Sequence, residues 1–235
     1  MQKGNLYLIP VWLGNYDLTR TIPPYVHQVI QLIDYYIVEN IKSALAFLKS
    51  TGINKNPAEL RFNLISSETS PARISEYIKP ALSGHHIGLL SEAGVPCVAD
   101  PGSEVVSIAH ENNIRVIPLT GPSSIILALM ASGLNGQNFL FAGYLPADKN
   151  RRNRSLAEIS SDVLRTGKTV IFIEAPHRND KLFESILESV NRNLKLCIAK
   201  NITFDDEFIK TKYIHQWKKE KIILGKTPVI YLIGR

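Results

Sequence analysis

The chain has 235 residues, of which 45% are hydrophobic and 20% charged, and this composition excludes a largely disordered protein. Its net charge of +6 favours anionic partners such as RNA without establishing one. The sequence contains no apolar run of about 18 residues and no secretory leader pattern at its start, so we expect a cytoplasmic protein without a membrane span.

Apolar runs and amphipathic stretches alternate along the chain. The apolar runs predict strands at 5–13, 34–39, 61–65, 86–92, 114–119, 138–145, 168–174, 195–202 and 227–234. The amphipathic stretches predict helices at 24–33, 42–50, 71–82, 104–112, 123–131 and 178–190. This order is typical of α/β proteins with mainly parallel sheets, and the strand-rich stretch after Lys168 indicates a mixed sheet. We expect two α/β domains, at residues 1–115 and 116–235.

The segment LLSEAGVPCVADPG (89–102) ends a predicted strand with two successive turns. Gly94 permits a positive φ, and the prolines stiffen both turns. Ligands of open α/β sheets bind at the carboxyl ends of strands, which is where this segment lies. Asp100 precedes a predicted helix, so its carboxylate either caps that helix or hydrogen-bonds a ligand.

Two further turns follow the same logic. LTGPSSIILALMASG (119–133) opens a helix whose first N–H groups can bind an anion, with Ser123 or Ser124 as a cap and the apolar run in the core. IEAPHR (173–178) ends a strand, and Arg178 can bind a phosphate through two N–H groups. Alternatively, Glu174 simply pairs with Arg178.

Other segments carry weaker signals. KNRRNR (149–154) is expected to be a loop, either solvated or in contact with RNA phosphates. Cys97 and Cys197 lie in apolar runs and are expected to be buried, reduced thiols without metal-ligand spacing. The sequence lacks the G-x-G-x-x-G dinucleotide pattern, a complete P-loop and a G-x-S-x-G elbow.

Together, these turns make the sequence resemble the tetrapyrrole methylase superfamily, whose members are S-adenosylmethionine-dependent methyltransferases without the common G-x-G loop. It is most similar to the branch that methylates a cytidine 2′-hydroxyl in small-subunit ribosomal RNA. The matching segments are SEAGVPCVADPG for SDAGTPLISDPG, PLTGPSSIILALMASG for PLPGPxxxxxALxxSG, FLFAGYLP for F-x-GFLP, EAPHR for ESPHR, and CIAKN for CIARE. The first third differs more, because VENIKSA stands where the family has A-E-D-T-R and retains only Glu39.

The resemblance implies two α/β domains that bind S-adenosyl-L-methionine in the cleft between them. The positions that match the family's donor pocket are Leu13, Ala99, Asp100, Ser103, Ser123, Ser124 and Glu174. The resemblance also implies a homodimer that acts on ribosomal RNA or the small ribosomal subunit.

Methyl transfer to a hydroxyl benefits from a group that accepts its proton. Glu92, Glu39 and His177 are the candidates, and Glu92 is preferred because it replaces an aspartate of the family. Asn15 and Glu39 are expected to contact the substrate. Arg178, Arg151 and Arg152 are expected to bind its phosphates.

Two other functions are compatible with the sequence. The first is methylation of a small molecule such as a tetrapyrrole, although PVWLGN and ADP match the G-A-G-P-G-D and G-D-P turns of those enzymes poorly. The second is binding of the cofactor or of RNA without catalysis, which the altered N-terminal segment favours.

Overall fold

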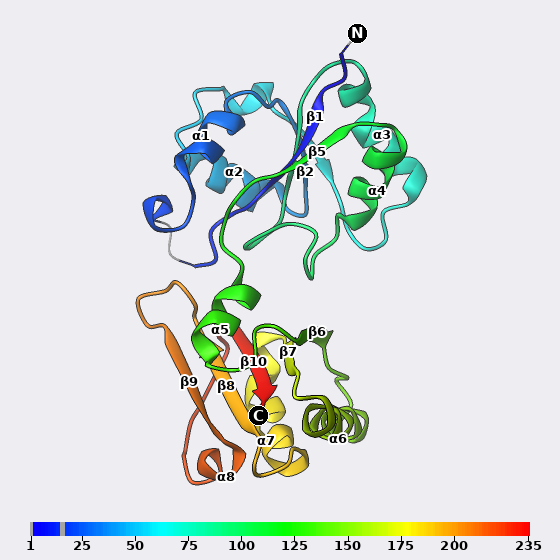
Figure 1. Cartoon of the computed structure of the whole chain (residues 1–235). Coiled ribbons are helices and arrows are strands. Elements are labelled where there is room, and N and C mark those ends of the chain that lie inside the picture. The colour runs from blue at the N-terminus through cyan, green and yellow to red at the C-terminus, as the bar shows by residue number, and fades with distance from the viewer. Residues whose placement is uncertain (1, 15–16) are drawn as a thin grey trace. The chain divides into compact units, whose positions relative to one another are not determined.

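The chain forms two compact units, Met1–Ser123 (unit 1) and Ser124–Arg235 (unit 2), in a computed structural model that describes residues 2–14 and 17–235. Each unit contains one five-stranded sheet with helices, which confirms the predicted α/β class (Figure 1). The division follows Ser123 rather than residue 115, because β5 (Arg115–Pro118) pairs with β1 (Asn5–Ile9) in the sheet of unit 1.

The sheet of unit 1 has the strand order β3-β2-β4-β1-β5, and its strand pairs are all parallel. Its other strands are β2 (Tyr35–Val38), β3 (Arg61–Leu64) and β4 (Ile87–Leu90). Its helices are α1 (Pro24–Ile30), α2 (Ile41–Ser50), α3 (Pro71–Leu82) and α4 (Ser103–Glu111), with 3-10 turns at Leu18–Arg20 and Pro57–Glu59. Because the strands are parallel, the loops that follow them meet at one edge of the sheet.

Helices cover both faces of this sheet, since successive side chains of a strand point to opposite sides. Tyr36 and Val38 of β2 pack in one cluster with Phe47 of α2. Ile37, between them, packs in a second cluster with Ile74 of α3. Figure 1 accordingly shows α1 and α2 on one side of the sheet and α3 and α4 on the other.

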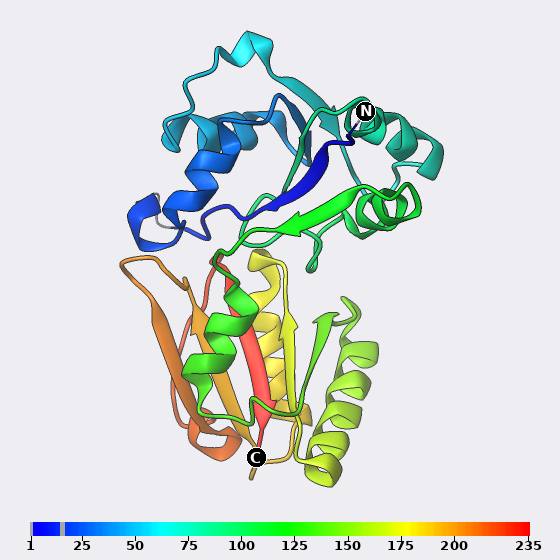
Figure 2. The ribbon, with the colours of Figure 1, turned by 45° about the horizontal axis from the view of Figure 1, so that its top comes forward.

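Unit 2 contains a mixed sheet of order β6-β7-β10-β8-β9, as the sequence predicted for this part of the chain. Its strands are β6 (Phe139–Tyr144), β7 (Thr169–Ile173), β8 (Lys195–Lys200), β9 (Phe208–Tyr213) and β10 (Val229–Gly234). Its helices are α5 (Ser124–Ser132), α6 (Lys149–Thr166), α7 (Asn179–Ser189) and α8 (Ile214–Trp217), with a 3-10 turn at Pro176–Arg178. In Figure 2, α5 lies across β8 and β10, with which it is in contact.

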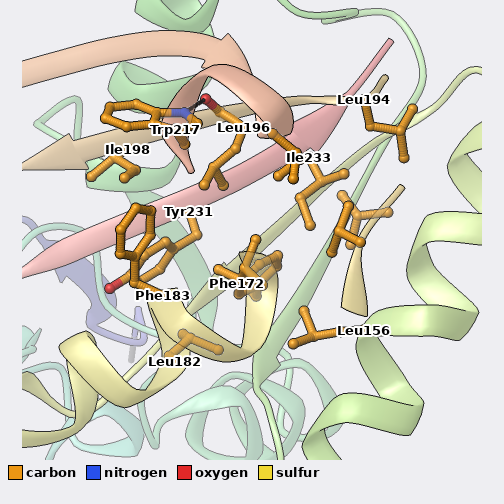
Figure 3. Packing of buried hydrophobic residues seen from close by; sticks show 14 of the residues in the cluster. Leu156, Phe172, Leu182, Phe183, Leu194, Leu196, Ile198, Trp217, Tyr231 and Ile233 are labelled. Atoms are coloured by element: carbon orange, nitrogen blue, oxygen red, sulfur yellow. Dashed lines mark hydrogen bonds between the residues drawn. The ribbon is translucent and has the colours of Figure 1, made fainter. Parts of the chain in front are cut away.

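Aromatic side chains organise the core of unit 2 (Figure 3). The rings of Phe172 and Tyr231 are stacked with their centroids 5.7 Å apart. Trp217 meets the ring of Phe183 edge-on, and its indole N–H donates to the carbonyl oxygen of Leu196 at 2.9 Å. The one polar atom of this buried indole is therefore satisfied, which a core tryptophan requires.

The prediction of a loop at 149–154 is wrong, because these residues form the first turns of α6. Asp148 caps the helix by accepting a hydrogen bond from the backbone N–H of Arg151 at 2.9 Å. The buried side of α6 carries Arg152, Leu156, Ser160 and Val163. Two of these four residues are polar, so the sequence lacks the regular apolar spacing that would have predicted a helix.

Two expectations of burial hold only in part. Ile125, Ala128 and Leu129 of α5 are buried, whereas Met130 is 74% exposed, so the apolar run is not wholly core. Both cysteines are free, and Cys197 is buried, but Cys97 is partly exposed.

Candidate active site

Three loops of unit 1 converge at the carboxyl edge of its sheet. Val11, after β1, donates its backbone N–H to the carbonyl oxygen of Gly94 at 2.8 Å, which ties the first loop to the loop after β4. Gly94 has a φ of +75°, and a Cβ atom there would lie 3.0 Å from Leu13 Cδ2 and 3.2 Å from the carbonyl oxygen of Pro122, after β5. A residue with a Cβ atom would be strained at this φ and would crowd these neighbours, whereas glycine is not. The close packing of the three loops therefore explains why glycine stands in the first turn of the segment 89–102.

The second turn of that segment has an unusual backbone. Cys97 and Ala99 have φ values of +68° and +67°, a left-handed conformation that residues with a Cβ rarely adopt. Gly102 is the N-cap residue of α4, and no side chain caps this helix. Asp100 therefore does not cap the helix, which leaves its carboxylate available to a ligand. Residues held in sparsely populated conformations cluster at ligand sites.

Three carboxylates interact at this edge. Burial first, and then the charges of Asp100 and Glu92, raise the pKa of Glu39 to about 7. Burial first, and then Glu92, raise the pKa of Asp100 to about 6. Glu92 is exposed, and its Oε1 accepts a hydrogen bond from Ser43 Oγ at 2.7 Å. The Oε1 atom of Glu39, by contrast, is buried and has no partner among the described residues.

Ionisation of these three carboxylates is unfavourable in the protein without a ligand, because burial and the neighbouring negative charges both disfavour the charged form. A bound cation or a proton would stabilise them. A carboxyl group with a pKa near neutrality is also well suited to accept a proton at neutral pH. The carboxyl edge of unit 1 can therefore hold a positively charged ligand beside a proton acceptor.

A cavity of about 420 Å³ in unit 1 brings together three of the predicted cofactor-binding residues, Ala99, Asp100 and Ser103. Ser66 and Ser67, in the loop that follows β3, line the same cavity and were not predicted. Their position after a parallel strand is the signal that could have identified them, because that is where ligands of such sheets bind.

In unit 2, Glu174 and Arg178 form the ion pair that the sequence left as an alternative. The Oε1 atom of Glu174 accepts hydrogen bonds from Arg178 Nε at 2.9 Å and Nη2 at 2.5 Å, and from the backbone N–H of Ala175 at 2.7 Å. The side chain of Glu174 is fully buried, and its Oε2 has no partner among the residues described. The pair fixes Arg178 at the end of β7, next to the exposed His177.

The predicted phosphate ligands of unit 2 separate into different environments. Arg152, His177 and Arg178 line one cavity of about 580 Å³. Arg151 is exposed on α6 and is not part of that lining. Arg152 is only 4% exposed, so it is not the solvated loop residue that was expected.

The remaining predicted residues belong to separate parts of the chain. Leu13, Ser123 and the three carboxylates lie in unit 1, whereas Ser124, the first residue of α5, lies in unit 2. Asn15 is outside the described residues. Within residues 2–14 and 17–235, no group of three or more His, Cys, Asp or Glu side chains could hold a metal ion. None of the described helices is both long and apolar enough to span a membrane.

Comparison with other proteins supports the resemblance. The family described as Tetrapyrrole (Corrin/Porphyrin) Methylases matches residues 30–215. A "Ribosomal RNA small subunit methyltransferase I" from Buchnera aphidicola subsp. Acyrthosiphon pisum is 30% identical over 235 residues, which are 98% of this chain and 78% of that protein. The protein of the same name from Halalkalibacterium halodurans is 32% identical over 239 residues, covering 97% and 75% of the two chains.

A solved structure agrees with these matches at the level of the fold. The crystal structure of the methyltransferase CobJ is similar with a TM-score of 0.65, and the likeness covers 99% of this chain and 94% of that one. Its sequence identity is 15%, so this likeness concerns the fold alone. With the family match and the near-complete coverage by relatives, it follows that the chain belongs to the tetrapyrrole (corrin/porphyrin) methylase family.

Proposed function

We propose that this protein is an S-adenosyl-L-methionine-dependent methyltransferase that methylates a ribose 2′-hydroxyl in small-subunit ribosomal RNA. The observation that carries the proposal is the similarity, over at least 97% of the chain, to two proteins named Ribosomal RNA small subunit methyltransferase I. The net charge of +6 supports an anionic substrate of this kind.

The carboxyl edge of unit 1 fits the proposed methyl donor. The carboxyl group of Asp100 makes no hydrogen bond to any described residue, and Glu39 offers a second oxygen without a partner. The Asp100 carboxylate suits a positively charged group of S-adenosylmethionine, and the Glu39 oxygen remains available to the acceptor hydroxyl. When bound, this donor supplies a methyl group that is activated by the positive charge of its sulfonium. Further proposed contacts are Leu13, Ala99, Ser103, Ser123, Ser124 and Glu174.

Among the three candidate bases, Glu39 is now the best supported, in place of Glu92. Glu92 is exposed and engaged by Ser43, whereas Glu39 combines a buried, unpartnered oxygen with a pKa of about 7. With the donor bound, the Glu39 carboxylate would accept the proton of the acceptor hydroxyl as this hydroxyl is methylated. The charge of Glu92 contributes by raising the pKa of both neighbouring carboxyl groups. His177 is assigned to substrate binding in unit 2.

Calorimetry with S-adenosylmethionine, followed by transfer of a labelled methyl group to undermethylated small ribosomal subunits, tests the proposal. We expect binding, labelled RNA, and at least tenfold weaker donor binding in Asp100→Asn. Glu59→Gln, which alters an exposed carboxylate in the 3-10 turn Pro57–Glu59, is the control and should bind normally. If the donor binds and label appears on a tetrapyrrole but not on RNA, the small-molecule alternative is favoured. If the donor binds and no methyl group is transferred to either, the non-catalytic alternative is favoured.

The family resemblance also leads us to propose a homodimer that works in the cytoplasm. Light scattering coupled to gel filtration should then give twice the chain mass of 26.3 kDa. A mass equal to a single chain at micromolar concentration would contradict the dimer.

A further inference from the structure

The cavity of unit 2 has an unusually basic lining. It is enclosed by the first turns of α6, the 3-10 turn Pro176–Arg178 and α7, and its volume is about 580 Å³. Its charged and titratable lining residues are Lys149, Arg152, His177, Arg178, Lys181 and Glu184. The lining thus holds four permanent cations and one carboxylate, and two of the cations also pair with carboxylates outside it. The remaining excess of positive charge lies in a concave surface, where it favours an anion.

Arg152 is the most informative of these residues. It is 4% exposed, and its partners are neutral: Nε donates to Ser185 Oγ at 3.0 Å, and Nη1 donates to the carbonyl oxygen of Ala147 at 2.8 Å. No carboxylate among the described residues accepts a hydrogen bond from it; Glu188 interacts with it through charge alone, since the pKa of Glu188 is lowered chiefly by its hydrogen bond with Lys149 and in part by the charge of Arg152. A buried guanidinium without a directly bound carboxylate is a position where an anion in the cavity would be stabilised.

Of the other cationic side chains of the lining, two pair with carboxylates and one is available to a ligand. Glu174 fixes Arg178 through Nε and Nη2. Lys149 pairs with Glu188, outside the lining, at 3.2 Å. Lys181 is exposed and makes no hydrogen bond or ion pair within the described part of the chain. The cavity therefore combines two arginines of fixed orientation with a lysine that is available to a ligand.

We propose that this cavity binds a backbone phosphate of the RNA substrate, with Arg152 and Arg178 as fixed ligands and Lys181 as a mobile one. Planar guanidinium groups held by other residues match the geometry of phosphate oxygens, and lysine adds a point charge. Such contacts position RNA without reading its sequence. This inference rests on the proposed function, because it assigns to unit 2 a part in holding the same substrate.

The test measures binding of a short fluorescent single-stranded RNA by anisotropy at several salt concentrations. Lys181→Gln removes one phosphate contact, so the slope of log K against log salt should become shallower by about 0.7, which is roughly a fourfold loss of affinity at 0.15 M salt. Lys218→Gln is the matched control, because Lys218 is exposed in the same unit and lies outside the cavity lining. It should retain the affinity and the slope of the unaltered protein.

Arg152→Lys provides a second variant, since it keeps the charge but removes the planar group. Its thermal melting curve should first show that unit 2 is folded, and RNA binding should then be weakened at least as much as in Lys181→Gln. Equal effects of Lys181→Gln and Lys218→Gln, or no effect of either, would overturn the inference, as would an unaltered protein that does not bind RNA.

Two further measurements distinguish RNA binding in the cavity from binding of free phosphate and from the proposed methyltransferase activity. If inorganic phosphate binds in calorimetry and Lys181→Gln abolishes that binding without changing RNA affinity, the ligand is a free phosphate and the inference is wrong. Methyl transfer to small subunits is measured in parallel with all variants. If the unaltered protein labels the RNA and Lys181→Gln binds RNA with unchanged affinity, only the role of the cavity is refuted. If Lys181→Gln binds RNA more weakly but the unaltered protein transfers no label, only the proposed function is refuted.

Discussion

Glu39→Gln should stabilise the protein at alkaline pH while it abolishes methyl transfer. The pKa of Glu39 is raised from its ordinary value of 4.5 to about 7, chiefly by burial. In a group fully shielded from solvent, a pKa raised this far would lower the free energy of unfolding at alkaline pH by roughly 3 kcal/mol. Solvent screening at this partly exposed position reduces it to about 1–2 kcal/mol.

The pH dependence follows from the direction of the raised pKa. At acidic pH, Glu39 is neutral in the folded and the unfolded chain, and the full stability is present. As pH rises from 4.5 toward 7, the unfolded chain ionises first, so this stability is lost and stays lost above pH 7. Glutamine cannot ionise, and Glu39→Gln should therefore gain about 1–2 kcal/mol in free energy of unfolding at pH 8 and only roughly a few tenths at pH 4.5.

Urea denaturation at the two pH values measures this difference, with Glu59→Gln as the control for loss of an exposed carboxylate. The same samples are assayed for methyl transfer to undermethylated small subunits, where Glu39→Gln should lose at least a hundredfold in rate if Glu39 is the base. Equal stability gains at pH 4.5 and pH 8, or a variant with normal turnover, would refute the reasoning.

Three further changes test the structure on which the sites depend. Gly102→Ala should cost about 1–3 kcal/mol, because φ is +136° there and the added Cβ would lie 3.0 Å from Leu89 Cδ2, and thermal melting checks this. Trp217→Ala should destabilise unit 2 by about 3–5 kcal/mol through loss of a fully buried indole, measurable by urea denaturation; a loss below about 1 kcal/mol would contradict the packing. Asp148→Ala should cost about 1 kcal/mol by removing the cap of α6, and an unchanged melting temperature would show that the cap contributes nothing.

The strands of unit 1 could be predicted well because buried parallel strands are continuous apolar runs. All four residues of β4 are buried, and the sequence alone marks them as a strand. The edge strand β9, by contrast, has the sequence FIKTKY, in which lysines interrupt the apolar residues, and it was not predicted. Helix α6 was missed for a related reason, since Arg152 occupies a buried position that patterns reserve for apolar residues.

The sequence predicted the candidate carboxylates but not which of them keeps a free oxygen. The rule that ligands bind after parallel strands pointed to Glu92 and Asp100, and the family resemblance pointed to Glu39. In the structure the charges of these three carboxylates interact. Which carboxylate keeps a free oxygen depends on Ser43, a residue 49 positions from Glu92 in the chain. Such a contact is set by tertiary packing, so the sequence favoured Glu92 where the structure favours Glu39.

The chemical position of the transferred methyl group decides whether the protein methylates a ribose. Undermethylated small ribosomal subunits are incubated with the protein and labelled S-adenosylmethionine, and the RNA is then hydrolysed in alkali. A 2′-O-methyl group protects the adjacent phosphodiester bond, so we expect label in an alkali-resistant dinucleotide, and at least a hundredfold less after the same incubation with Glu39→Gln. Label in single nucleotides would place the methyl group on a base, and unlabelled RNA from the unaltered protein would contradict ribosomal RNA methylation itself.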